Sequence, residues 1–292
     1  MEHSLGVAII GAGITGLTAA DHLVKSGREV HVFDKGRGAG GRIATRWTEN
    51  GVFDHGAPEL QAESREFRDF LAALGAIVGE CGSNFGAPGM RSIFDQLISK
   101  LDIYQGAEVA AIDRESGGLG LHFADGRLVA PVAREIAAEI EKVRMQPVWS
   151  CLVEFSEPLA LEGKSAGRGA VLRADRMASK PLRNDPREAW VIHMRPEFAR
   201  AQLFADRAIV APTIIEAFGD AYGLTLPQVR HLEAHRWRYA FADQPLGRPF
   251  VGDVGSGLLV GGDWTLGGRA EHGFESGRAV ANAVLSREVV KV

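Results

Sequence analysis

A glycine-rich turn between an apolar run and a helix constrains this chain more than any other feature. Residues 5–10 are apolar and rich in β-branched side chains, and they lead directly into Gly11-Ala12-Gly13-Ile14-Thr15-Gly16. A strand, G-x-G-x-x-G and a helix are typical of the site that holds a dinucleotide pyrophosphate. The apolar spacing of residues 17–26 predicts that helix, and Gly27 is a natural place for it to end.

A second strand and an acidic residue complete this pattern. Residues 29–34 predict a strand that ends in Asp34, 18 residues after Gly16. In dinucleotide-binding units an acid at about this distance accepts hydrogen bonds from ribose hydroxyls. The motif therefore predicts a bound dinucleotide, and by itself it leaves NAD, NADP and FAD open.

A second glycine-rich segment narrows this choice. It runs from Lys35 through Arg37 to Gly40-Gly41-Arg42 and carries three cations among small residues. Small residues let backbone N–H groups approach an anion, and arginines bind phosphate oxygens in pairs. NAD dehydrogenases do not need such a loop, whereas flavoproteins with G-G-R after the second strand use one. We therefore expect FAD.

The C-terminal segment has features of the same site. Residues 258–263 predict a buried strand that ends in Gly262-Asp263, and a helix is predicted over 271–285. An aspartate in this place can accept a hydrogen bond from a sugar or ribityl hydroxyl. The helix N-terminus near Glu271 carries partial positive charge, which would stabilise an anionic reduced flavin.

The composition excludes several function classes. The 292 residues are 46% hydrophobic and 24% charged, with a formal net charge of −4. We therefore expect a soluble protein of one large or two modest domains, with neither nucleic acid nor an anionic membrane as its main partner. No apolar run is long enough for a transmembrane helix, and the N-terminal apolar stretch is too short for a signal peptide. Cys81 and Cys151 have no disulfide or metal spacing, so we expect a cytoplasmic protein.

The rest of the chain is predicted to alternate between helices and strands. The predicted helices are residues 64–74, 91–101, 132–143, 198–204 and 213–222, and the predicted strands are 108–113, 120–124, 148–155, 169–173, 190–194 and 231–240, with a hairpin turn at Asp125-Gly126.

Three blocks of the sequence coincide: the first glycine motif with Asp34, the Gly40-Gly41-Arg42 loop, and Gly262-Asp263-Trp264 with Gly267-Gly268-Arg269. Together they resemble the FAD-dependent amine oxidase superfamily, and more closely its bacterial renalase-like branch. The branch is supported by three further stretches: Phe53-Asp54-His55-Gly56-Ala57, Arg144-Met145-Gln146-Pro147-Val148-Trp149 and His235-Arg236-Trp237-Arg238-Tyr239-Ala240.

The resemblance implies an α/β fold, in which a Rossmann-type FAD-binding domain is intertwined with a mixed α+β substrate domain, as in p-hydroxybenzoate hydroxylase. The implied FAD-binding domain consists of residues 1–58, 88–130 and 246–292, and the substrate domain of 59–87 and 131–245. It further implies non-covalent FAD. Family members oxidise isomers of dihydronicotinamide dinucleotides by hydride transfer to the flavin, which oxygen then reoxidises to give hydrogen peroxide.

The resemblance also implies the residues on each side of the flavin. On the substrate side the candidates are Trp237, Tyr239 and His193, although a packed aromatic pair and a core histidine explain the same residues. No acid–base residue is assigned, because hydride leaves a dihydropyridine without removal of a proton. The cofactor-binding candidates are Gly11, Ala12, Gly13, Ile14, Thr15, Gly16, Asp34, Lys35, Arg37, Gly41, Arg42, His55, Gly56, Ala57, Val109, Gly262, Asp263 and Glu271.

Alternatives remain for both the reaction and the site. The substrate could be a small amine, and the chain is shorter than its relatives at residues 58–85 and 128–131, which leaves an FAD-binding protein with little catalysis open. His231 and His235 would form a metal pair only on a helix with Glu directly after the first histidine, whereas Leu232 stands there in a predicted strand. No metal is expected.

Overall fold

The computed structural model describes residues 6–115, 118–123 and 134–289, and the predicted hairpin turn at Asp125-Gly126 lies outside them. Packing divides the chain into two compact units, each assembled from separated segments. Unit 1 consists of residues 1–41, 94–144 and 241–292, and unit 2 of residues 42–93 and 145–240. Residues 42–58 thus pack with unit 2, although the prediction gave them to the FAD-binding domain. Because the predicted limits concern cofactor binding rather than packing, they stay a prediction.

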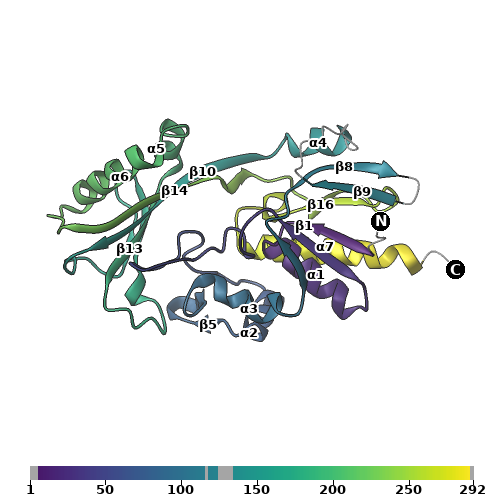
Figure 1. Cartoon of the computed structure of the whole chain (residues 1–292), viewed down its shortest axis with the longest axis horizontal. Helices are drawn as coiled ribbons and strands as arrows, with labels where there is room; N and C mark the ends of the chain where they lie inside the picture. Colours follow the sequence, from purple (N-terminus) through teal and green to yellow (C-terminus); the bar gives the residue numbers. More distant parts are fainter. Residues whose placement is uncertain (1–5, 116–117, 124–133, 290–292) are drawn as a thin grey trace. The chain divides into compact units, whose positions relative to one another are not determined.

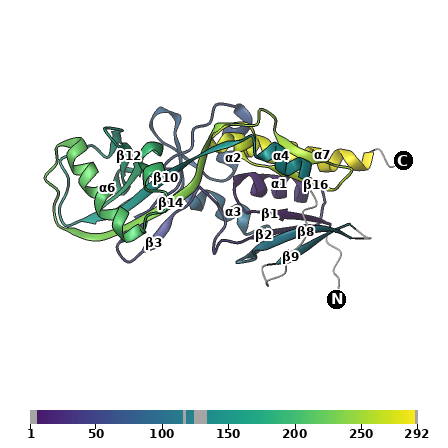
Figure 2. The same cartoon turned by 90° about the horizontal axis from the view of Figure 1, so that it is seen from above.

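A parallel sheet with strand order β1-β2-β7 forms the centre of unit 1. Its strands are β1 (Val7–Ile10), β2 (Val30–Asp34) and β7 (Asp102–Gln105). Helix α1 (Ile14–Lys25) joins β1 to β2 and buries Leu17 and Leu23, so the predicted strand–helix–strand unit is present. Helix α7 (Ala270–Val289) lies alongside α1 in both views (Figure 1, Figure 2).

Unit 1 also contains two antiparallel hairpins and two short helices. They are β8 (Val109–Glu115) with β9 (Gly118–Phe123), β15 (Phe250–Asp253) with β16 (Leu258–Gly261), α3 (Asp95–Ile98) and α4 (Arg134–Ile140). A short 3-10 turn (Asp263–Thr265) follows β16 and leads toward α7.

Unit 2 is built on a five-stranded sheet with the order β11-β12-β13-β10-β14. The strands are β11 (Lys164–Ala166), β12 (Val171–Arg176), β13 (Glu188–Met194), β10 (Arg144–Phe155) and β14 (Val229–Gln244). The other elements are β3 (Arg46–Thr48), β4 (Gly51–Phe53), α2 (Arg65–Ala73), β5 (Ile77–Val78), β6 (Asn84–Phe85), α5 (Pro196–Ala201) and α6 (Arg207–Tyr222), with 3-10 turns at Glu80–Gly82, Met90–Phe94 and Met177–Ser179.

Both faces of this sheet are covered, which explains why its central strands are apolar. On one face Trp149 and Trp190 pack in a core with Phe218 of α6, and on the other Leu152 packs with Phe53 of the β3–β4 hairpin. Neighbouring residues of β10 therefore point into different cores, as the two-residue period of a strand requires.

Some predicted elements differ from the structure because tertiary contacts override the local pattern. The helix predicted over 91–101 is wrong in length: a 3-10 turn and the short α3 occupy its place, and β7 begins at Asp102. Pairing of β7 with β2, where Asp102 lies opposite His31, continues the sheet directly after this helix. Helix α6 begins six residues before the predicted start and continues through Pro212.

Candidate dinucleotide site

The three glycines of the first motif each have a different structural task. Gly11 has φ +102°, which a side chain rarely permits. A Cβ on Gly16 would lie 1.9 Å from the carbonyl oxygen of Gly11, so α1 approaches β1 closely only because that atom is missing. A Cβ on Gly13 would have nothing within 4 Å. Open space next to the backbone at this position is what a pyrophosphate requires.

Helix α1 begins without a side-chain cap. Its N-cap residue is Gly13, which offers no side-chain oxygen, and the first turn contains no acidic residue. The first N–H groups of a helix have no partner within the helix, and the helix dipole places partial positive charge there. This end of α1 is therefore suited to an anion such as a phosphate.

Asp34 is fixed by the backbone at both of its carboxylate oxygens. Ala12 N donates to Oδ2 at 2.6 Å, and Gly36 N donates to Oδ1 at 2.6 Å. Each carboxylate oxygen has more than one acceptor position, so these two bonds orient the group and leave acceptor capacity for hydroxyls. The first glycine turn and the acid predicted to bind ribose are thus directly linked.

The second glycine loop lies against the first. Gly40 N donates to Ala12 O at 2.8 Å, and Gly41, at φ +59°, would place a Cβ 3.1 Å from the Cα of Gly13. Only small residues permit this contact. Lys35 and Arg37, at the start of the loop, are exposed.

The C-terminal part of the candidate site joins the same cluster within unit 1. A Cβ on Gly273 of α7 would lie 2.7 Å from Ile14 Cγ2, 3.0 Å from Thr15 Oγ1 and 3.6 Å from the Cβ of Asp263. Asp263 and Glu271 are both buried, and Glu271 lies in the first turn of α7. Gly262 and Asp263 therefore adjoin the first glycine motif. Val109 begins β8, opposite Phe123.

Unit 2 holds the other predicted cofactor residues. The guanidinium of Arg42 donates to the backbone oxygens of Tyr239 at 3.4 Å and Ala240 at 3.0 Å. Ala57 N donates to Arg42 O at 2.8 Å, and a Cβ on Gly56 would lie 2.0 Å from that oxygen. The segment 55–57 is thus closely packed on the backbone of Arg42. A phosphate contact by Arg42 stays a prediction.

Three neighbouring strands of unit 2 send hydrogen-bond donors to this segment. Ser150 Oγ of β10 and Trp237 Nε1 of β14 both donate to His55 O at 2.8 Å. His193 Nε2 of β13 donates to Gly56 O at 3.0 Å, which fixes its tautomer because a carbonyl only accepts. His193 is a buried histidine bonded to backbone, Trp237 is half-buried, and Tyr239 is 69% exposed. Sequence reasoning missed Ser150, because nothing in its neighbours signals this contact.

The histidines beside Trp237 are held in the neutral form. His55 stacks on the ring of Trp237 and meets His235 edge-on, with ring centroids 5.3 Å and 4.8 Å apart. Burial lowers the pKa of His55 from 6.5 to about 3 and that of His235 to about 4, and the charge of Arg46 adds to both shifts. At neutral pH both rings are therefore uncharged, and neither is present as the imidazolium that could act as an acid.

Asp54, directly before His55, belongs to a buried ionic cluster that no sequence pattern indicates. The carboxylate of Asp54 accepts from Lys180 Nζ at 2.8 Å and from Arg183 Nη2 at 2.6 Å. Thr45 Oγ1 and Met90 N donate to its other oxygen. All three charged residues are buried, and although burial alone would raise the pKa of Asp54, the two cations hold it below its usual value.

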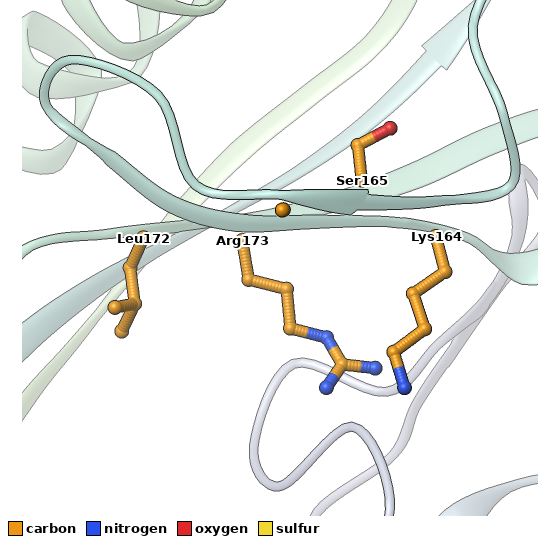
Figure 3. Close-up of a pocket in the computed structure, with 5 residues that line it drawn as sticks. Lys164, Ser165, Leu172 and Arg173 are labelled. Carbon is orange, nitrogen blue, oxygen red and sulfur yellow. The ribbon is translucent and has the colours of Figure 1, made fainter. Parts of the chain in front are cut away.

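A surface pocket lies elsewhere, at the β11–β12 hairpin of unit 2. Figure 3 shows the side chains of Lys164 and Arg173 on one side of the hairpin, with Ser165 pointing to the other side. Both cations bond to Glu59 and Arg173 also bonds to Asp175, so two carboxylates balance the two positive charges. Among the described residues, no helix could span a membrane, and no group of His, Cys, Asp and Glu could hold a metal. Burial raises the pKa of the Cys151 thiol, which makes it a poor nucleophile.

Comparisons with known proteins agree with this geometry. A family model described as an NAD(P)-binding Rossmann-like domain matches residues 9–74. The 4,4'-diapophytoene desaturase (4,4'-diaponeurosporene-forming) of Staphylococcus aureus strain Newman is 34% identical over 79 residues, which are 27% of this chain and only 14% of the desaturase.

The likeness to solved structures extends over the whole fold. Putrescine oxidase bound to putrescine has a TM-score of 0.72 at 13% identity, covering 97% of this chain and 99% of the oxidase. A redesigned triple variant of it gives 0.69 at 13% identity, covering 97% and 99%. The predicted fold class is confirmed: a Rossmann-like dinucleotide-binding domain with an antiparallel sheet domain, as in the amine oxidase fold.

Proposed function

We propose that this chain is an FAD-dependent oxidoreductase that binds its flavin non-covalently. The observation that carries the proposal is the contact between two glycine loops in unit 1, where Gly41 lies against Gly13 beside the uncapped end of α1. A resident nicotinamide dinucleotide accounts for the first loop and Asp34. The second loop and the adjoining Asp263 are additional features that an FAD site uses.

Each part of the cluster has a role in this proposal. The space beside Gly13 takes the pyrophosphate, and the N–H groups of the first turn of α1 donate to it. Asp34 binds ribose hydroxyls, Asp263 binds a ribityl hydroxyl, and the first turn of α7 presents N–H groups to the ring. When bound, FAD supplies a two-electron acceptor that oxygen can reoxidise.

For the substrate we favour a reduced nicotinamide dinucleotide isomer, or NAD(P)H. Hydride leaves a dihydropyridine because an aromatic ring results, so no protein base is needed. The overall reaction converts the reduced nicotinamide, oxygen and one proton into the oxidised nicotinamide and hydrogen peroxide.

Oxidation of a small amine is the second candidate. It is favoured by the likeness of the whole fold to putrescine oxidase. That likeness rests on 13% identity and concerns the fold, so it does not select a substrate.

Anaerobic stopped-flow mixing of the purified protein tests these proposals. We expect a yellow protein whose flavin absorbance is bleached by isomeric dihydronicotinamides and restored by oxygen with release of peroxide. Bleaching by putrescine but not by dihydronicotinamides would establish the amine reaction instead. If no donor bleaches the flavin, the chain is an FAD-binding protein with little catalysis. A colourless protein that cannot be reconstituted with FAD would refute the flavin site.

A further inference from the structure

Two buried hydroxyl groups hold the backbone of Gly262, the residue that directly precedes Asp263. Gly262 N donates to Ser276 Oγ at 2.9 Å, and Thr265 Oγ1 lies 2.7 Å from Gly262 O. Ser276 and Thr265 are both fully buried. Both backbone polar groups of Gly262 are therefore in contact with side chains that come from outside β16.

The same two hydroxyls meet at a second backbone oxygen. Ser276 Oγ donates to Pro249 O at 2.6 Å, and Thr265 Oγ1 lies 3.0 Å from the same oxygen. Pro249 directly precedes β15, so the two side chains connect the start of β15, the end of β16 and helix α7. Because both are buried, bulk water cannot replace a lost hydroxyl. Without Ser276 Oγ the N–H of Gly262 would lose its acceptor, whereas without Thr265 Oγ1 the oxygen of Gly262 would keep only the N–H of Thr265, at 3.1 Å.

The backbone of Asp263 is restrained from its other side as well. Its carbonyl oxygen accepts from Leu266 N at 3.0 Å and from Gly267 N at 2.7 Å. The backbone is therefore restrained on both sides of Asp263, by the hydroxyls at Gly262 and by the turn that these two bonds close, and this backbone positions the Asp263 side chain. A preorganised acceptor binds its ligand more tightly than one that must be ordered on binding.

We infer that Ser276 and Thr265 are positioning residues for Asp263 and determine how tightly the protein retains its flavin. This inference rests on the proposed FAD site. Neither residue belongs to the sequence motifs, because their role depends on a contact with Pro249 that the sequence does not reveal.

Side-chain variants of the full-length apoprotein test this inference by FAD titration, followed by quenching of flavin fluorescence. Thr265→Val keeps the shape and removes the hydroxyl, whereas Thr265→Ser keeps the hydroxyl. Ser276→Ala removes the other hydroxyl. Ser286→Ala is the matched control on α7, because the exposed Ser286 donates only to Asn282 O of its own helix. Circular dichroism at the titration temperature reports whether each variant is folded.

We expect Thr265→Val and Ser276→Ala each to raise the Kd for FAD about tenfold, as the loss of a buried hydrogen bond suggests. Thr265→Ser and Ser286→Ala should stay within about twofold of the parent. If the hydroxyls act through Asp263, adding Ser276→Ala to Asp263→Asn should change the Kd by less than about twofold.

The possible failures are distinguishable. If the parent protein binds no FAD, the proposed function itself is wrong. If the parent binds FAD and both hydroxyl-deleting variants bind it equally well, only this inference is wrong. If Thr265→Ser binds FAD as weakly as Thr265→Val, the residue has a packing role and the inference is overturned. The inference is likewise overturned if Ser276→Ala raises the Kd for FAD as much in the Asp263→Asn background as in the parent.

Discussion

At the scale of single residues, Gly13 and Gly16 make opposite predictions although they belong to one motif. Gly13→Ala should leave the protein folded, because the new Cβ meets nothing within 4 Å and φ is −78°. It should still weaken FAD binding by tenfold or more, on the order expected when a methyl group occupies ligand space. Gly16→Ala should destabilise the fold itself, since its Cβ would lie 1.9 Å from Gly11 O.

The measurement pairs urea unfolding of both apoproteins with FAD titration. Gly16→Ala should show the lower midpoint and Gly13→Ala the higher Kd at near-parental midpoint. Equal unfolding midpoints for the two variants would contradict the close approach of α1 to β1.

Asp54 carries a second prediction at this scale. Asp54→Asn leaves Lys180 and Arg183 buried without their shared counter-charge. Breaking a buried ionic pair in this way costs about 3–5 kcal/mol of unfolding free energy. Urea denaturation measures it, with Glu197→Gln as the control, since the Glu197–Arg200 pair is exposed and should contribute little. A loss no larger than that of the control would show that the buried cluster is not stabilised by charge.

At the scale of elements, the local sequence pattern predicts a strand or helix correctly where that element buries one of its faces. The apolar run, the glycine motif and the helical spacing of apolar residues predicted β1, α1 and β2, because all of these signals lie within about thirty consecutive residues. Strand β7 was missed because Asp102 and Gln105 look like surface residues. Its existence depends on pairing with β2, a partner some seventy residues earlier. Ser150 and the bond of Trp237 to His55 O could not be predicted from the sequence for the same reason.

The buried histidines beside the sheet of unit 2, His55 and His235, should make the free energy of unfolding depend on pH. The pKa of His55 is about 3 in the folded chain and 6.5 in the unfolded one, so between these values the unfolded state binds more protons. The contribution of His55 to the free energy of unfolding is therefore fully present above pH 6.5 and decreases as the pH is lowered. At 1.36 kcal/mol per pH unit, His55 alone contributes a loss of about 2 kcal/mol by pH 5, and His235 adds to it.

Urea unfolding between pH 7.5 and 5 measures this loss. Acidic groups whose pKa is lowered, such as Asp54 and Glu59, titrate mainly below this pH range. The histidines therefore account for most of the change in unfolding free energy within it. The variant His235→Gln should show a shallower slope than the parent because it has one proton fewer to gain. A slope unchanged by this substitution would argue against a buried, neutral His235.

At the scale of the whole molecule, two segments far apart in the sequence meet in unit 1. The first glycine motif and Asp263 are separated by more than two hundred residues, yet Gly273 contacts Ile14 and Thr15. The sequence allows this contact between distant segments to be predicted, because both segments carry motifs typical of dinucleotide binding. The packing of residues 42–58 with unit 2 could not be predicted in that way, because it depends on contacts such as Phe53 with Leu152.

This arrangement predicts where a flavin will rigidify the chain. A ligand lowers local opening in the segments that it contacts. In hydrogen exchange at labelling times short enough for local opening only, FAD should protect residues 9–17, 34–41 and 262–273, which unit 1 brings together. Helices α5 and α6 of unit 2 should exchange as before. FMN, which lacks the adenosine half, is the matched control and should leave residues 34–41 unprotected. Protection of α5 and α6 equal to that of residues 9–17, or none at residues 9–17, would contradict a flavin held by the glycine loops.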